Sequence, residues 1–263
     1  MDVMTKKLLM QATKYYTLTV STNPASATCT LTYDGVAHSE KTATVKEGTV
    51  IQYSVYHSTY GTTTGSITMN SNKTLSCTGT YSTTPVTTEQ SWTRPNLSSN
   101  GTLGSGTFAV GSPNTAISNY PAWKAVNGTS NADNYDTWIP NLTGTSESKP
   151  AIFTFYSSTP IKISSLQLIS FKQNIRVPKA GYVKCSNNNS SYTNLCSWSN
   201  SNTTSPVTIN ISVNSSSFYN YHQVYITSNS ASGYGTSISE LKITATYQTT
   251  TQQYNYYWNK TVT

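Results

Sequence analysis

The stretch YPAWKAVNGTSNADNYDTW, from Tyr120 to Trp138, predicts a corner of a β-rich domain. It opens with an apolar cluster around Trp123, turns at Asn127-Gly128 and closes on Thr137-Trp138. Asn and Gly both tolerate positive φ, so this dipeptide indicates a turn with a physical cause. A tryptophan on each side of a polar loop predicts that the loop is pinned at both ends to a hydrophobic core.

The composition of the whole chain favours strands over helices. Only 10% of the 263 residues are charged, and Ser, Thr, Asn and Tyr dominate. Such a chain cannot build salt-bridged helices, whereas Thr, Tyr and Val fit a pleated sheet. No sustained helical periodicity follows the first dozen residues. We therefore expect an all-β protein, long enough for one large domain or two modest ones.

Charge and hydropathy exclude two kinds of partner. The formal net charge is +7, but the Lys and Arg are scattered singly, whereas a nucleic-acid-binding protein would cluster them on one face. No transmembrane span is expected. The apolar run at residues 8–10 is too short for a signal peptide. A strand-rich chain of this composition without a signal peptide favours a virion protein assembled in a host cytoplasm. A trimmed extracellular or cell-surface protein is the alternative.

The first part of the chain predicts a small β-sandwich over residues 15–81. Apolar residues alternate along it, as in Leu18 and Val20, and an Asp34-Gly35 turn separates two of the short strands. Six or seven strands in a segment of this length fit a sandwich. The spacing from Asn23 to Val55 also resembles the Ig-like or PEGA-like modules that recur in bacterial surface and phage proteins.

The second part of the chain resembles the discoidin-like jelly rolls, which include the family 32 carbohydrate-binding modules. The motif that carries the resemblance is Ala-x-x-Ala-hydrophobic-Asn-Gly, followed by a polar loop and Thr137-Trp138. Further segments match in the expected order: Ala151–Phe155 and Ile161–Ile169 around a corner, Gly181–Leu195 with Tyr192, Phe218-Tyr219 with Val224–Ile226, and Ile238–Ile243. The resemblance covers Trp92 to Tyr247 and implies a galactose-binding-like β-sandwich.

The resulting domain plan has five parts. It comprises an N-terminal arm (1–14), an Ig-like β-sandwich (15–81), a Thr-rich linker (82–91), a discoidin-like jelly roll (92–247) and a C-terminal tail (248–263). The tail carries the aromatic group Tyr254, Tyr256, Tyr257 and Trp258. We expect this tail either to fold back or to dock on another subunit, as in a homo-oligomer or a virion-bound protein.

The chain does not predict an enzyme. Of its nine carboxylates, only Asp133, Asp136 and Glu240 fall near one expected loop end, and glycoside hydrolysis needs two carboxylates that face each other across a cleft. The three histidines have no partner at the spacing of a triad or a metal site. We interpret these polar groups as solvated surface residues.

The resemblance implies one structural Ca²⁺ beside the Asn-Gly turn. The matching positions are Asn127, Thr137 and Glu240, and Asp133 or Asp136 would compensate for the Asn that replaces the family's Asp. Calcium takes six to eight oxygen ligands, several of them carboxylate. A plain hydrogen-bonded turn without a metal is the alternative.

The resemblance also implies glycan binding by loops at one end of the jelly roll. The ligand would be a host or mucosal glycan, held by an aromatic ring and by polar side chains. Tyr234, between two glycines, is the aromatic candidate, with Lys172, Asn174 and Arg176 as polar candidates. We expect a phage tail-fibre, head-fibre or decoration protein. Alternatives are an architectural protein whose arms bind neighbouring subunits, in which Tyr234 caps the barrel, and a bacterial adhesin fragment.

Four cysteines divide evenly between the two predicted domains. Cys29 and Cys77 fall in the first, Cys185 and Cys196 in the second, so two disulfides are one interpretation. Cys185 and Cys196 would face one another if their hairpin is symmetric. Four buried thiols are the alternative, favoured by assembly in a reducing cytoplasm.

Overall fold

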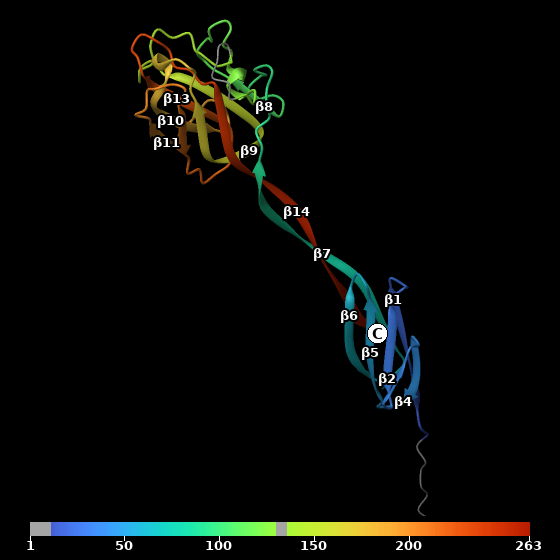
Figure 1. The fold of residues 1–263 in the computed structure, drawn as a ribbon. Helices are drawn as coiled ribbons and strands as arrows, with labels where there is room; N and C mark the ends of the chain where they lie inside the picture. The colour runs from blue at the N-terminus through green and yellow to red at the C-terminus, as the bar shows by residue number, and fades with distance from the viewer. Residues whose placement is uncertain (1–11, 130–135) are drawn as a thin grey trace, which may run out of the picture. The chain divides into compact units, whose positions relative to one another are not determined.

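The computed structural model describes residues 12–129 and 136–263. Their regular structure consists of strands and two short 3₁₀ helices, η1 (Ala122–Val126) and η2 (Asn174–Arg176) (Figure 1). The all-β class predicted from composition is therefore confirmed. Within these two ranges, no helix is long and apolar enough to cross a membrane.

The chain forms two compact units. The first comprises residues up to Val86 together with Thr251–Thr263, and the second comprises Thr87–Thr250. Strands β7 (Lys73–Trp92) and β14 (Glu240–Val262) are neighbours in the sheet order and contribute to both units. The segments predicted as a linker and as a C-terminal tail thus lie in strands, because their Thr and Tyr residues favour extended backbone. Most of the predicted N-terminal arm lies outside the described residues.

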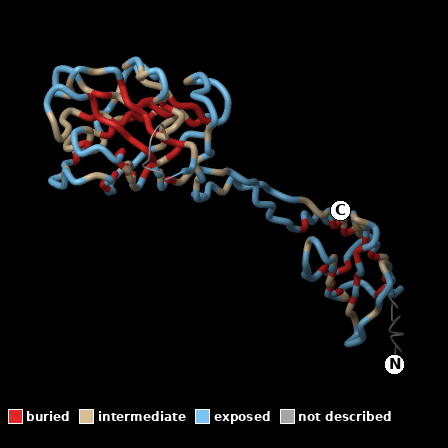
Figure 2. The backbone as a smooth tube through the Cα atoms, turned by 45° about the horizontal axis from the view of Figure 1, so that its top comes forward, coloured by how far each residue is buried: buried red, intermediate tan, exposed pale blue. Residues whose placement is uncertain are grey.

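The first unit is a sandwich of two sheets. One sheet has the order β14–β7–β1–β4, with β1 parallel to β7, and the other has the order β3–β2–β5–β6. The remaining strands are β1 (Tyr15–Asn23), β2 (Thr28–Tyr33), β3 (Val36–His38), β4 (Thr42–Lys46), β5 (Val50–His57) and β6 (Gly61–Thr68). Leu18, Leu31, Ile51 and Leu75 are fully buried between the sheets. Figure 2 shows the buried backbone of each unit in red. The predicted turn at Asp34-Gly35 joins β2 to β3, with both residues at positive φ.

The second unit is also a sandwich, organised by one long strand. Strand β9 (Ala151–Ile169) pairs through its first half with β8 and β13 and through its second half with β12 and β14. The two strands predicted on either side of a corner are therefore one strand that changes partners. The other strands are β8 (Phe108–Gly111), β10 (Pro178–Ser186), β11 (Thr193–Ser199), β12 (Thr208–Ser212) and β13 (Tyr219–Asn229).

The tryptophan-bracketed stretch closes this second core, as predicted. Helix η1 buries Ala122, Ala125 and Val126. Trp138 is fully buried and meets Phe153 edge to face, with ring centroids 5.2 Å apart. The backbone of Trp138 exchanges two hydrogen bonds with Ile238, of 2.8 and 3.1 Å, so the far end of the loop is fixed to the segment that leads into β14.

Candidate functional site

The loop end of the second unit brings Tyr234 and Arg176 together. Tyr234 is 45% exposed, and the guanidinium carbon of Arg176 lies 5.7 Å from the centre of its ring. Arg176 Nη1 donates to the Gly235 carbonyl at 3.0 Å, and Nε donates to Gln173 Oε1 at 3.0 Å. An exposed ring is thus held against a guanidinium whose own position is fixed.

Backbone geometry explains why the Tyr234 loop adopts this shape. Gly233 has φ +82°, and a Cβ on Gly235 would lie 2.9 Å from the Pro140 carbonyl oxygen, so a side chain at position 235 would collide with backbone. The Asn229 amide donates to the carbonyls of Tyr234 (2.9 Å) and Ile175 (3.1 Å). One side chain therefore joins the Tyr234 loop to the loop that carries Arg176. Asn229 is not among the residues predicted for the site from the sequence.

The other two predicted glycan-binding residues lie on the loop of Arg176. Asn174 Oδ1 accepts hydrogen bonds from the Ser205 amide (2.8 Å) and hydroxyl (3.0 Å), so this oxygen has a structural role. Lys172 is exposed. Partial burial lowers the pKa of Arg176 from its ordinary value, and an arginine remains cationic at neutral pH despite such a shift.

Three of the predicted calcium ligands, Asn127, Asp136 and Glu240, lie in two hydrogen-bonded groups. In the first group, the Asn127 amide and the Thr129 hydroxyl donate to the two oxygens of the Asp136 carboxylate. In the second, Arg94 Nη2 lies 2.5 Å from Glu240 Oε1, and Arg94 Nη1 donates to the Val126 carbonyl. The side chain of Arg94 therefore supplies the positive charge beside Glu240.

As they lie, these donors do not fit Ca²⁺. The Arg94 guanidinium bonds to the Glu240 carboxylate and to the Val126 carbonyl. Both oxygens of the Asp136 carboxylate already accept hydrogen bonds, from Asn127 and Thr129. Thr137 Oγ1 and Glu240 Oε2 are buried with no hydrogen-bond partner within the described part of the chain. Residues 12–129 and 136–263 hold no group of three His, Cys, Asp or Glu placed for a metal. Asp133, the other candidate, lies outside these ranges.

Burial dominates the electrostatics of Glu240. It raises the pKa of this carboxyl to about 7, while the neighbouring Arg94 opposes the shift. The ion pair is nearly solvent-free, since the side chains of Arg94 and Glu240 are 9% and 3% exposed. This arrangement joins the segment before β8, the end of η1 and the start of β14.

All four cysteines are free thiols in the structure. The register of β10 and β11 places Cys185 opposite Thr193, and Cys196 opposite Val183. The two cysteines therefore do not face one another as a symmetric hairpin would require, because Cys196 pairs with Val183, two positions before Cys185. Burial raises the pKa of the Cys29 thiol, and the nearby Cys77 adds to the rise.

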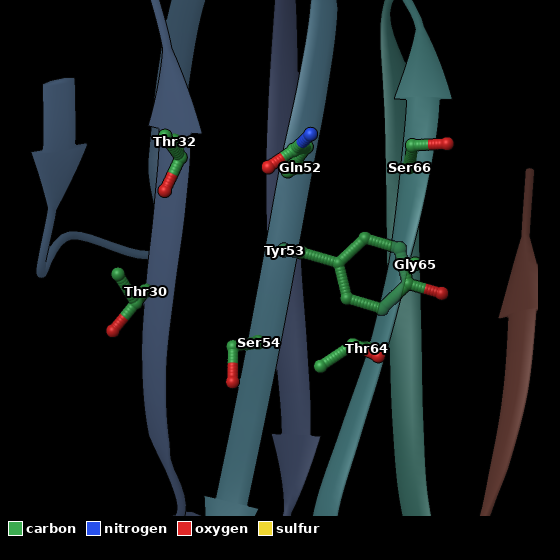
Figure 3. A pocket seen from close by; sticks show the side chains of 8 residues that line it. All are labelled: Thr30, Thr32, Gln52, Tyr53, Ser54, Thr64, Gly65 and Ser66. Atoms are coloured by element: carbon green, nitrogen blue, oxygen red, sulfur yellow. The ribbon is translucent and has the colours of Figure 1, made fainter. Parts of the chain in front are cut away.

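The first unit has a polar hollow of about 450 Å³ on the outer face of strands β2, β5 and β6 (Figure 3). Short neutral side chains such as Thr30, Gln52 and Ser66 line it. The ring of Tyr53 extends toward Gly65, where a Cβ would lie 2.4 Å from the Tyr53 hydroxyl oxygen. The hollow offers hydroxyl groups but no charged side chain among its lining residues.

Comparison with known proteins finds similarity at the level of structure. No protein-family model matches the chain, and no curated protein matches it. The chain is similar to the family 32 carbohydrate-binding module of NanJ from C. perfringens, solved with galactose, at 15% identity and a TM-score of 0.42, covering 54% of this chain and 93% of that one.

Two further modules of family 32 are similar to the same degree. One, from Clostridium perfringens, was solved with GalNAc-β-1,3-galactose, at 12% identity and a TM-score of 0.43, covering 52% of this chain and 94% of that one. The other, from AlyQ, was solved with 4,5-unsaturated mannuronic acid, at 14% identity and a TM-score of 0.42, covering 52% of this chain and 95% of that one. The three TM-scores are below 0.5, and similarity at this level does not assign a function.

Proposed function

We propose that this chain is a non-catalytic carbohydrate-binding protein whose second unit binds a glycan at the loop end around Tyr234. The observation that carries the proposal is the exposed Tyr234 ring held 5.7 Å from the fixed guanidinium of Arg176. An aromatic face packs against the C–H groups of a sugar ring, and adjacent guanidinium donors hydrogen-bond its hydroxyl or carboxylate oxygens. A small number of polar groups that converge beside an aromatic surface is typical of ligand-binding sites.

The test is binding of the full chain to a glycan array, with Tyr234→Ala and Arg176→Lys as variants. Tyr234→Ala removes the ring and should abolish binding. Arg176→Lys keeps the charge but loses the planar set of donors, so it should weaken binding. Tyr257→Ala is the matched control, because Tyr257 is also about half exposed but belongs to the first unit. The assignment of this site is refuted if Tyr234→Ala binds, at wild-type strength, every glycan that the wild type binds.

The biological setting we infer is the surface of a phage virion, as a tail-fibre, head-fibre or decoration protein that contacts host or mucosal glycans. The composition supports this setting, since a charge-poor, Thr- and Tyr-rich chain suits an extended β-structured surface protein. Negative-stain imaging of particles labelled with antibody against the chain would test it. Unlabelled particles would favour the bacterial adhesin alternative.

An architectural role is the second candidate, and a specific observation favours it. Tyr81, Tyr254 and Tyr256 of the first unit are about half exposed and pack against one another, with ring centroids 5.4 to 6.2 Å apart. A cluster of exposed rings is typical of a surface that another subunit covers. Light scattering should then show a homo-oligomer that Tyr254→Ser and Tyr256→Ser convert to monomers. An unchanged mass in the double variant would count against this role.

A further inference from the structure

An open groove of about 640 Å³ lies on the second unit and shares no lining residue with the loop end around Tyr234. Its floor is formed by neighbouring positions of strands β8, β9 and β13, namely Gly111, Thr154 and Gln223. The segment 100–103 lines one side, and Asn189 from the turn between β10 and β11 also contributes. Gly111 adds no side chain, and the Leu103 side chain packs there instead, since a Cβ on Gly111 would lie 3.1 Å from Leu103 Cδ1.

The floor carries a buried hydrogen-bond acceptor that has no partner. Thr154 and Gln223 face away from the core, because the alternate residues Phe153, Phe155 and Val224 are the ones in the core cluster. Gln223 is only 8% exposed, and its Nε2 donates to Thr154 Oγ1 over a long 3.2 Å. Its Oε1 accepts no hydrogen bond from the described residues.

A buried amide oxygen without a donor destabilises a folded protein, so its presence on a groove floor indicates a ligand. The oxygen itself is covered, and a ligand hydroxyl would reach it once the amide turns toward the groove. That turn breaks one long hydrogen bond. Gln223 thus has the position and the unused capacity of a ligand-binding side chain.

Aromatic side chains lie beside the groove on the same strands. Tyr156 on β9 and Tyr221 on β13 pack with ring centroids 4.8 Å apart. Tyr192 donates through its hydroxyl to Asn189 Oδ1 at 2.6 Å. Burial, with Tyr221 and Tyr225 nearby, raises the pKa of Tyr192 to about 12, so this phenol remains a protonated donor at all ordinary pH values.

The lining of the groove selects for an uncharged ligand. Its polar side chains are amides and hydroxyls, such as those of Asn100, Thr102 and Asn189, and its apolar ones include Leu103 and Pro113. None of the lining residues is Asp, Glu, Lys or Arg. The nearest cation by strand register is Lys184, which lies opposite Gln223 and places its Nζ 3.7 Å from the centre of the Tyr225 ring.

We propose that this groove is a second carbohydrate-binding site, which takes a segment of a neutral oligosaccharide. The amide and hydroxyl groups of the floor and wall bind the sugar hydroxyls, and Leu103, Pro113 and the neighbouring tyrosines pack against its C–H faces. The site goes beyond the proposed function of the Tyr234 loops, because the two sites have no residue in common and either can exist without the other.

The experiment is an array of neutral oligosaccharides, including β-1,4-linked glucose, mannose and N-acetylglucosamine hexamers, followed by calorimetric titration of the full chain with the strongest binder. Thr102→Trp fills the groove from an exposed wall position. Ser105→Trp is its matched control, because Ser105 is exposed on the same loop but does not line the groove. Gln223→Met removes the unpaired acceptor while it keeps the shape of the side chain.

Thr102→Trp and Gln223→Met should each weaken binding by about tenfold or more, whereas Ser105→Trp and Tyr257→Ala, a first-unit variant, should bind as the wild type does. Gln223→Met should also melt at the same temperature as the wild type or higher, since it removes an unsatisfied buried group. The proposal is overturned if the wild type binds no neutral oligosaccharide, or if Thr102→Trp leaves binding intact. Loss of all binding in Tyr234→Ala alone would overturn it and support the loop site.

Discussion

Arg94 and Glu240 form an ion pair of 2.5 Å with almost no exposure to solvent. The same guanidinium donates to the Val126 carbonyl at the end of η1. One side chain therefore fixes three segments that are far apart in the sequence. The Arg94 guanidinium thus places a positive charge beside Glu240, one of the residues predicted to bind Ca²⁺.

Removal of either partner of this pair should destabilise the second unit. Glu240→Leu leaves the buried Arg94 guanidinium without a counter-charge, and Arg94→Met leaves the buried Glu240 carboxyl without its partner. Loss of one partner of a buried pair costs about 3–5 kcal/mol, whereas replacement of both by apolar residues is often neutral. The free energy of unfolding should thus fall in each single variant and recover in the double variant. Urea denaturation followed by tryptophan fluorescence measures this.

The exposed pair Lys162–Glu89 provides the control for this prediction. Its distance is also 2.5 Å, but its side chains are 28% and 41% exposed. Exposed ion pairs contribute little to stability, so Lys162→Met should leave the urea midpoint nearly unchanged. Equal losses in Lys162→Met and Arg94→Met would show that burial of the Arg94 pair has no special role.

Chelation should leave the thermal transition of the second unit unchanged. A ligand that binds only the native state stabilises it by mass action, so removal of a bound Ca²⁺ would lower the melting temperature. Because Arg94 bonds to the oxygens that calcium would need, we expect the same melting curve in excess EDTA and in millimolar Ca²⁺. A melting temperature that falls with EDTA and returns with Ca²⁺ would show that these donors rearrange around a metal.

The sequence predicted the strands well where apolar residues alternate, as at Leu18, Val20 and Leu31, because such a pattern has one structural meaning. It also predicted that Trp138 anchors the polar loop. It did not predict the ion pair, since Arg94 and Glu240 are 146 residues apart and no local pattern joins them.

The candidate site was only partly predictable for the same reason. The glycine-flanked Tyr234 and the nearby Arg176 are visible in the sequence, since glycines flanking an aromatic residue indicate an exposed turn. The role of Asn229, which bonds to both loops, depends on the packing of two distant segments. The Gln223 groove depends on the register of β9 and β13, which the sequence alone does not fix.

His222 should make the second unit sensitive to acid. Burial lowers the pKa of His222 to about 3, and neither ring nitrogen has a hydrogen-bond partner among the described residues. Below the ordinary pKa of about 6.5 the unfolded chain therefore binds a proton that the folded chain does not. From this group alone, the free energy of unfolding should fall as the pH drops from 6.5 toward 3, by up to about 1.4 kcal/mol per pH unit. Glu240, whose pKa is raised from 4.5 to about 7 in the folded chain, contributes in the opposite direction over part of this range, so the effect of His222 is measured against a variant that lacks the ring.

The variant His222→Leu tests this assignment. It removes the titrating ring from its stack on Phe155, so its free energy of unfolding should increase relative to that of the wild type as the pH falls below 6.5, from a value at pH 7 that is equal to the wild type or higher. Urea midpoints from pH 7 down to pH 4, followed by tryptophan fluorescence, measure the slope. Parallel curves for wild type and variant would assign the acid sensitivity to other groups.

The C-terminal strand should be part of the core of the first unit, although the sequence analysis placed residues 248–263 outside both sandwiches. Strand alternation puts Trp258 and Tyr257 on opposite faces: Trp258 is 9% exposed and donates through Nε1 to the Gly61 carbonyl at 3.0 Å, while Tyr257 is 48% exposed. Trp258→Ala should therefore lower the free energy of unfolding by about 3–5 kcal/mol, whereas Tyr257→Ala should stay within about 0.5 kcal/mol of the wild type.

Hydrogen exchange of the full chain at β1 and β5 measures both effects, and it does not depend on the fluorescence of Trp258, which the first variant lacks. If Trp258→Ala leaves exchange in these strands as slow as in the wild type, Trp258 contributes nothing to the core, and the tail is a passive extension available to a second subunit.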